Sequence, residues 1–170
     1  VEFNVSCHNV NFDFSAIIEE VLRRAVPASR FPVILKLSPD FDYLEHARLA
    51  EATGVAAISA INTVKGLRLN PATEAPLLKN RYGGLSGRAI KPIGLRVVSE
   101  LREAGIKLPI IAGGGVRTFS DVREYGWAGA DAASLGSEAW LKPLWSMPLA
   151  PFHALHIRRL IGQVEGWSPR

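Results

Sequence analysis

Cys7, the only cysteine of the chain, lies among small polar side chains close to the start of the sequence. Residues 1–5 alternate apolar and polar, as a strand does, and Ser6, Cys7 and Asn9 follow them. A thiol at a strand end, flanked by the amides of Asn4 and Asn9, is suited to work beside a small planar ligand, because amides both donate and accept hydrogen bonds. The alternative is a buried, inert cysteine, which is the more common situation for this residue.

Two glycine-rich segments, Gly113-Gly114-Gly115 and Gly136-Ser137, each follow a short apolar run. Glycine loops at strand ends present backbone N–H groups to a phosphate, and barrel enzymes commonly hold a phosphate after their last two strands. For one loop alone, a tight turn would be sufficient explanation. Two such loops in succession favour a phosphate site.

Lys36 lies in the otherwise apolar run 33–37, where a cation is costly to bury without an anionic partner. An ion pair with Glu2 is one interpretation, and a cation that stabilises negative charge on a bound cofactor is the other. Asn62 and Thr63 follow a further apolar run. They either cap the next loop or join the asparagines of the first strand end in binding the edge of a heterocycle.

Strand-like apolar runs alternate with helical patterns, which predicts strand–helix units around a parallel sheet. The expected strands are 1–5, 32–37, 55–61, 108–112 and 132–135, and the expected helices are 15–26, 42–53, 91–104, 118–127 and 152–164. Ser15 is the expected N-cap of the first helix and Pro27 its end. The segment 62–87 is expected to be a long functional loop. Polar or glycine-rich residues then follow each of these strands, and Lys36 lies within the second, at the carboxyl ends where such folds bind ligands.

The composition fits one globular domain, since 48% of the 170 residues are hydrophobic and 21% are charged. A single cysteine excludes an internal disulfide and any cysteine-rich metal centre, so we expect a reducing, cytoplasmic location and no metal. The formal charge of +4 is spread over helix faces, which argues against nucleic acid. No apolar stretch approaches the roughly 20 residues of a membrane span, and there is no signal-peptide pattern. Because the chain begins inside a strand and without methionine, we expect a longer protein.

Several motifs together resemble the dihydroorotate dehydrogenase family. They are Asn-Val-Ser-Cys-His-Asn, Leu-Lys-Leu-Ser-Pro, Ile-Asn-Thr-Val-Lys-Gly, Gly-Gly-Leu-Ser-Gly-Arg-Ala-Ile-Lys-Pro, Ala-Gly-Gly-Gly-Val and Leu-Gly-Ser, in that order. The resemblance runs from residue 1 to about residue 141. It implies an α/β fold, a TIM (β/α)8 barrel of which this chain holds strands four to eight only, as a truncated barrel and a single catalytic domain over 1–170.

The resemblance also implies residue roles and an activity. Cys7 is then the general base that removes a proton from carbon 5 of dihydroorotate while hydride passes from carbon 6 to FMN. The implied substrate-binding residues are Asn4, Asn9, Asn62 and Thr63, and the implied FMN-binding residues are Lys36, Ile61, Gly87, Gly114, Gly115, Gly136 and Ser137. The implied function is FMN-dependent oxidation of dihydroorotate to orotate in de novo pyrimidine biosynthesis.

A cysteine base resembles the cytosolic class of the family, where membrane-linked members have serine. Asn-Thr-Val-Lys-Gly and Gly-Gly-Leu-Ser-Gly are similar to the form that passes electrons to NAD through a separate iron–sulfur and FAD subunit, whereas Arg88 and the segment 93–96 also resemble the quinone-linked class. A homo-oligomer is expected. His8 stands where the family usually has proline, and we interpret it as a tolerated loop substitution.

Two alternatives stay open beside this interpretation. The flavin domain of dihydropyrimidine dehydrogenase, which reduces uracil and thymine, shares the asparagine, cysteine and Gly-Gly-x-Ser-Gly motifs. A non-catalytic barrel fragment that binds a phosphate-bearing ligand is the other. For the 170 residues alone we expect weak or absent activity, because an open half barrel lacks part of its pocket.

Overall fold

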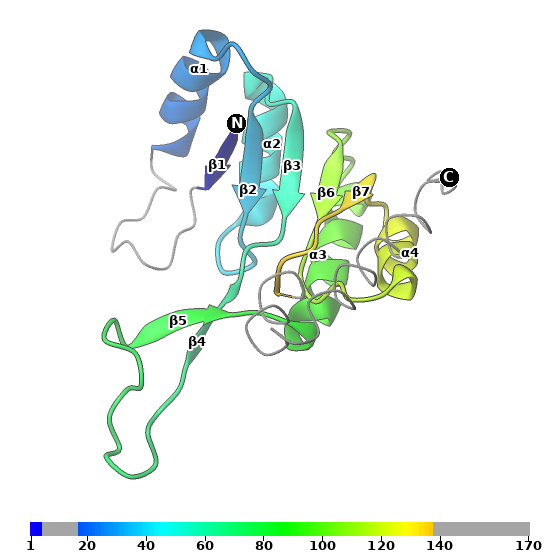
Figure 1. The fold of residues 1–170 in the computed structure, drawn as a ribbon. Helices are drawn as coiled ribbons and strands as arrows, with labels where there is room; N and C mark the ends of the chain where they lie inside the picture. The colour runs from blue at the N-terminus through cyan, green and yellow to red at the C-terminus, as the bar shows by residue number, and fades with distance from the viewer. Residues whose placement is uncertain (5–16, 138–170) are drawn as a thin grey trace, which may run out of the picture.

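A five-stranded parallel sheet forms the centre of the computed structural model, which describes residues 1–4 and 17–137 (Figure 1). Its strands are β1 (Glu2–Asn4), β2 (Ile34–Leu37), β3 (Ala57–Ala60), β6 (Ile110–Ala112) and β7 (Ala132–Ala133), in that spatial order. Every neighbouring pair is parallel. The predicted α/β fold with a parallel sheet is confirmed, and each observed strand lies inside the range expected for it.

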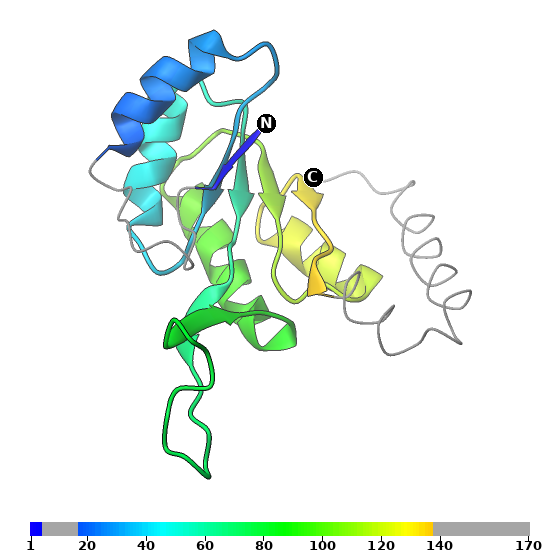
Figure 2. The same cartoon turned by 60° about the vertical axis from the view of Figure 1, so that its left-hand side comes forward.

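The helices α1 (Ile18–Ala28), α2 (Tyr43–Thr53), α3 (Lys91–Glu103) and α4 (Phe119–Trp127) connect the strands, with a short 3-10 helix, η1 (Arg88–Ile90), ahead of α3. Successive helices pack on one another, and α2, α3 and α4 also pack on strands (Figure 2). Local sequence explains the boundaries. Asp42 caps α2 by accepting a hydrogen bond from the Glu45 N–H at 2.9 Å, and Gly54 ends it in a left-handed conformation.

The end of α1 differs from the prediction. The helix continues through Pro27 to Ala28 instead of stopping before the proline. A proline in the last turn removes only one backbone hydrogen bond, and the Ser29 N–H closes the helix by donating to the Val26 carbonyl at 3.3 Å.

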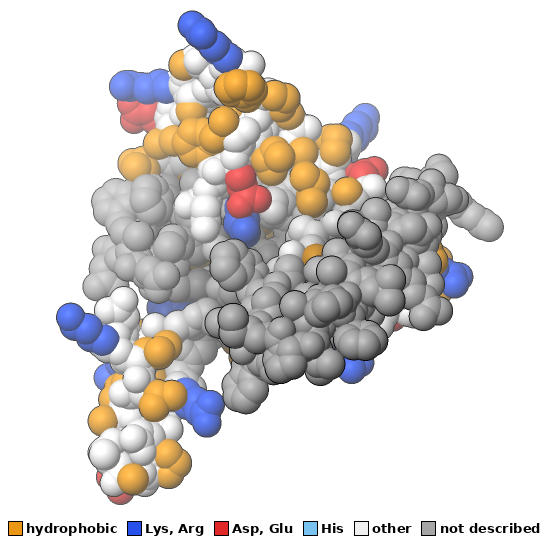
Figure 3. All heavy atoms as spheres, viewed as in Figure 1, with side chains coloured by type: hydrophobic (Ala, Val, Ile, Leu, Met, Phe, Trp, Pro, Cys, Tyr) orange, Lys and Arg blue, Asp and Glu red, His pale blue; other side chains and the backbone are white. Residues whose placement is uncertain are grey.

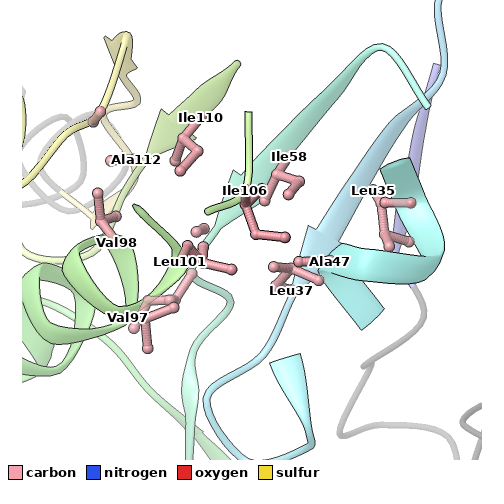
Figure 4. Close-up of a cluster of buried hydrophobic side chains, with 14 of the residues drawn as sticks. Leu35, Leu37, Ala47, Ile58, Val97, Val98, Leu101, Ile106, Ile110 and Ala112 are labelled. Carbon is pink, nitrogen blue, oxygen red and sulfur yellow. The ribbon is translucent and has the colours of Figure 1, made fainter. Parts of the chain in front are cut away.

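Apolar side chains from the sheet and the helices form one buried cluster between them (Figure 4). Leu35 and Leu37 from β2, Ile58 from β3 and Ile110 from β6 meet Val97 and Leu101 from α3, and all of these are 0% exposed. Each such side chain contributes about 1.5–3 kcal/mol on burial. The cluster therefore holds the strand ends in fixed relative positions.

The segment 62–87 is not the irregular loop that we expected. Residues Val64–Leu67 (β4) and Tyr82–Leu85 (β5) pair as an antiparallel hairpin, with Val64 opposite Leu85 and Leu67 opposite Tyr82. Gly84 permits the close approach, since a Cβ there would overlap the Thr63 side chain. The hairpin projects away from the sheet in both views (Figures 1 and 2), and apolar and basic side chains lie side by side on it (Figure 3).

Some predictions fall outside the described residues: the helix 152–164, the Ser15 cap, and the positions of Cys7, His8 and Asn9. Within the described ranges, no helix has the length and apolar character that crossing a membrane requires. The same ranges hold no cluster of three or more His, Cys, Asp or Glu side chains arranged to bind a metal ion.

Candidate functional site

A pocket of about 660 Å³ opens at the carboxyl ends of the strands, within the size range of small-molecule sites. The loops after β3, β6 and β7, the start of η1 and one side chain of β2 all contribute to it. The lining residues are Lys36, Ile61, Asn62, Thr63, Ser86, Gly87, Arg88, Ile90, Gly113, Gly114, Gly115, Val116, Arg117, Ser134, Gly136 and Ser137.

Most of the residues singled out from the sequence meet in this pocket. Those that line it are Lys36, Ile61, Asn62, Thr63, Gly87, Gly114, Gly115, Gly136 and Ser137. Asn4 is not a lining residue but adjoins the pocket, because the Asn62 side-chain amide donates a hydrogen bond to the Asn4 side-chain oxygen at 3.1 Å. Cys7 and Asn9 lie outside the described residues. The amides of β1 and of the loop after β3 are therefore at one place, as the strand-end argument predicts.

Lys36 makes contacts that agree with both interpretations given for it, the ion pair and the cofactor contact. Its ammonium lies 3.0 Å from the Glu2 carboxylate on the neighbouring strand β1, so the structural ion pair exists. The Lys36 side chain is nevertheless 27% exposed and lines the pocket. The role of Lys36 toward a cofactor stays a prediction, and it requires a variant that separates the two contacts.

The loop after β6 has a backbone that only glycine permits. Gly114 and Gly115 have φ values of +110° and +71°. A Cβ at Gly115 would lie 2.8 Å from the Lys91 Cβ, 3.0 Å from the Gly87 carbonyl oxygen and 3.2 Å from the Arg88 Cα. The loop after β6 and the start of η1 therefore touch along their backbones. Together they form a wall of the pocket made of peptide groups.

An ion-pair network fixes this loop to the start of α3. The Lys91 ammonium contacts the Asp121 carboxylate and lies 2.8 Å from that of Glu124. Asp121 also accepts hydrogen bonds from the N–H groups of Arg117 at 3.0 Å and Thr118 at 2.8 Å, and from the Thr118 hydroxyl at 2.8 Å.

These contacts determine the charge states of the network. Burial works to raise the pKa of Asp121, but the hydrogen bonds from Lys91, Thr118 and the backbone outweigh it and lower that pKa to about 2. Burial works to lower the pKa of Lys91, and its hydrogen bonds and attraction to Asp121 and Glu124 raise it overall. Both groups are therefore charged at neutral pH.

Several lining residues were not part of the site predicted from the sequence: Ser86, Arg88, Ile90, Val116, Arg117 and Ser134. Arg88 and Arg117 could have been found, because Arg88 directly follows Gly87 of the predicted FMN site, Arg117 closely follows Gly115 of a predicted phosphate loop, and both add positive charge there. Ile90 and Val116 could not, because they are buried apolar residues like the rest of the core.

The fold and the pocket together define a class of protein. It is a parallel α/β domain with a glycine-lined, cation-flanked pocket at the carboxyl ends of its strands, where such folds bind phosphate-bearing ligands. Comparison with known proteins gives the family. A family model described as dihydroorotate dehydrogenase matches residues 1–148, and the chain belongs to this family. The resemblance seen in the motifs is thereby confirmed.

Individual relatives agree on the family, and their names differ in naming fumarate or NAD(+). The chain is 43% identical over 144 residues to a protein of Lactobacillus delbrueckii subsp. bulgaricus named dihydroorotate dehydrogenase A (fumarate), covering 81% of this chain and 47% of that protein. It is 40% identical over 150 residues to a Bacillus mycoides protein named dihydroorotate dehydrogenase B (NAD(+)), catalytic subunit, covering 84% and 48%. The chain spans about half the length of the curated relatives it matches.

Proposed function

We propose that this chain is part of an FMN-dependent dihydroorotate dehydrogenase that oxidises dihydroorotate to orotate in pyrimidine biosynthesis. The observation that carries the proposal is the pocket itself. It gathers a cation, a pair of linked amides and two glycine loops at one edge of the sheet, in a chain of this family.

The pocket fits the phosphate of a flavin mononucleotide. The peptide wall at Gly87, Gly114 and Gly115 has no side chain to exclude an anion, and a Cβ at Gly136 would meet nothing within 4 Å. Arg88 and Arg117 add positive charge beside it. Gly114, Gly115, Gly136 and Ser137 would hold the phosphate, and Lys36, Ile61 and Gly87 would contact the rest of the cofactor.

Asn62 and Thr63, which line the pocket, belong to the proposed substrate site. Asn4, Asn9, Asn62 and Thr63 would hydrogen-bond the pyrimidine ring and its carboxylate. Cys7 would act as the general base and take the proton from carbon 5 of dihydroorotate. Bound FMN would supply the acceptor for the hydride from carbon 6. The residues of this chain orient the ring and hold the proton at the Cys7 sulfur.

We also infer that the chain forms one catalytic domain whose parallel strands are strands four to eight of a TIM barrel. The strand order β1-β2-β3-β6-β7 supports this, because the strands of this sheet are neighbours in the order in which they occur along the chain, as in a barrel, while β4 and β5 form a separate hairpin. The half-length match to the relatives supports it as well. An experimental structure of the full-length protein tests it: β1 and β7 should each pair with a strand outside this chain.

For the electron acceptor we propose NAD, reached through a separate iron–sulfur and FAD subunit. The support is the likeness of Asn-Thr-Val-Lys-Gly and Gly-Gly-Leu-Ser-Gly to the NAD-linked form, and the name of the Bacillus mycoides relative, a catalytic subunit. The relative named for fumarate is 43% identical to the chain and the one named for NAD(+) is 40% identical, so identity does not favour NAD and a direct measurement is needed. Rapid reoxidation of the reduced flavin by fumarate, without a second subunit, would contradict the proposal.

The function itself is tested by cofactor and product. Full-length protein is purified, the released flavin is identified by chromatography, and the protein is incubated with dihydroorotate or dihydrouracil and an artificial electron acceptor. The proposal predicts released FMN and formation of orotate from dihydroorotate only. Oxidation of dihydrouracil instead would indicate a dihydropyrimidine dehydrogenase-like activity, and absence of flavin binding would exclude both enzymes.

A further inference from the structure

Tyr125 lies directly beneath the glycine loop and outside the pocket. It belongs to α4, its side chain is 0% exposed, and it is not among the lining residues. Its hydroxyl oxygen is 2.7 Å from the Gly114 carbonyl oxygen and 3.2 Å from that of Gly113, which also accepts a hydrogen bond from the Ile61 N–H at 3.3 Å. A single hydroxyl proton is thus shared between two consecutive carbonyls of the loop after β6.

Those two contacts determine where the neighbouring N–H groups point. In a trans peptide the C=O and the following N–H lie on opposite sides, and both peptides here are trans. Since the carbonyls of Gly113 and Gly114 face Tyr125, the N–H groups of Gly114 and Gly115 face away from it. Both of these glycines line the pocket. Among the residues that the structure describes, neither N–H donates a hydrogen bond.

The surroundings of Tyr125 are fitted to its hydroxyl. Gly94 of α3 lies against it, and a Cβ at that position would overlap the hydroxyl oxygen. Burial raises the pKa of Tyr125, and the charges of Asp121 and Glu124 raise it further, so the hydroxyl keeps its proton and stays a donor.

We propose that Tyr125 is a positioning residue for phosphate binding: its hydroxyl holds the Gly113 and Gly114 carbonyls and so aims the Gly114 and Gly115 N–H groups at the phosphate. The inference rests on the proposed function, because the phosphate is that of the bound flavin. It assigns part of the phosphate affinity to a buried hydroxyl that never touches the ligand.

The test compares FMN with riboflavin, which lacks the phosphate. Full-length wild-type protein and the Tyr125→Phe variant are stripped of flavin, and both dissociation constants are measured by flavin fluorescence. We expect Tyr125→Phe to weaken FMN binding about five- to tenfold, the usual effect of one hydrogen bond, and to leave riboflavin binding unchanged. A merely structural role would weaken both ligands alike.

Tyr43→Phe is the matched control. This substitution also removes a hydrogen-bonded hydroxyl, one that contacts Glu100 and Arg96. Tyr43, however, lies on α2 and does not line the pocket. It should change neither dissociation constant. If Tyr125→Phe does not fold, Gly94→Ala is the second variant: its Cβ would overlap the Tyr125 hydroxyl and lie 3.1 Å from the Gly113 carbonyl oxygen, so it disturbs the same contact and should give the same selective loss of FMN.

The outcomes separate this inference from the proposed function. Equal weakening of FMN and riboflavin by Tyr125→Phe, or no weakening of either, overturns the positioning role while the wild-type protein still binds FMN. A wild-type protein that binds neither flavin overturns the proposed function.

Discussion

At the residue scale, Lys36 combines two contacts that act in different ways. Its pairing with Glu2 joins β1 to β2, and its place on the pocket wall sets a positive charge beside the proposed flavin. A partly exposed ion pair contributes about 0–1 kcal/mol to stability. A cation beside a cofactor that gains negative charge on reduction instead changes the reduction potential. The two roles therefore have different observables.

We predict that Lys36→Met lowers the reduction potential of the bound flavin by about 30 mV, because the reduced, more negative flavin loses a stabilising cation. The potential is measured by anaerobic titration with a reference dye. Glu2→Gln is the control: it breaks the same ion pair but keeps the cation, so the potential should stay the same or rise. If both variants lose a little thermal stability equally and neither changes the reduction potential, Lys36 has only the structural role of the ion pair with Glu2.

At the scale of elements, the contact between the loop after β6 and the start of η1 shapes the proposed phosphate site. Gly115 and Gly105 have similar φ values, +71° and +83°, but a Cβ at Gly105 would meet nothing within 4 Å. Alanine substitutions at Gly115 and Gly105 therefore distinguish the effect of backbone strain from the effect of losing the loop contact.

We predict that Gly115→Ala weakens FMN binding at least tenfold, because its Cβ would push the loop away from Gly87 and Lys91. Gly105→Ala should lower the free energy of unfolding by about 1 kcal/mol, from its left-handed backbone alone, and leave FMN binding unchanged. Flavin titration and chemical denaturation measure the two effects. Unaltered FMN affinity in Gly115→Ala would contradict the assigned loop.

The network at Asp121 gives a pH-dependent contribution to stability. Its pKa is about 2 in the folded protein, below the value of about 3.9 expected in the unfolded chain. The contribution is therefore fully present above about pH 4 and is lost as the pH falls toward 2. We predict that Asp121→Asn costs about 2 kcal/mol at pH 7 and that its difference from wild type shrinks between pH 4 and pH 2.

Chemical denaturation at several pH values measures this difference. Glu19→Gln is the control, since Glu19 forms an exposed i,i+4 pair with Arg23 and its loss should cost less than about 0.5 kcal/mol. A difference between Asp121→Asn and wild type that does not change with pH would show that the carboxylate charge is not what stabilises the loop.

The sequence predicts the parallel sheet well, because continuous apolar runs such as 33–37 alternate with capped helices like the one after Asp42. It fails for the β4–β5 hairpin, whose strands are only four residues each and lie far apart in the chain. Pairing over that distance depends on tertiary contacts, here the fit of Gly84 against Thr63. The contact between Tyr125 and Gly94 could not be predicted from the sequence for the same reason, because it is a tertiary contact that joins two helices through one hydroxyl.

At the scale of the whole molecule, the described sheet begins at β1 and ends at β7. In the proposed barrel both strands have further neighbours, so the 170 residues alone would leave the pocket open to water on one side. We predict that the isolated chain oxidises dihydroorotate weakly or not at all, as measured by orotate absorbance with an artificial acceptor. Turnover equal to that of the full-length protein would contradict the barrel assignment.

We propose that this chain supplies the base and the flavin site of a dihydroorotate dehydrogenase. The test is anaerobic bleaching of the flavin by dihydroorotate in the full-length protein. The bleaching rate is measured by stopped-flow absorbance for wild type and Cys7→Ser at neutral pH. We predict rapid bleaching in wild type and a rate about 10²–10⁴-fold lower in the variant, which should still bind FMN. Bleaching at equal rates in the two proteins, or none in the FMN-bound wild type, would contradict it.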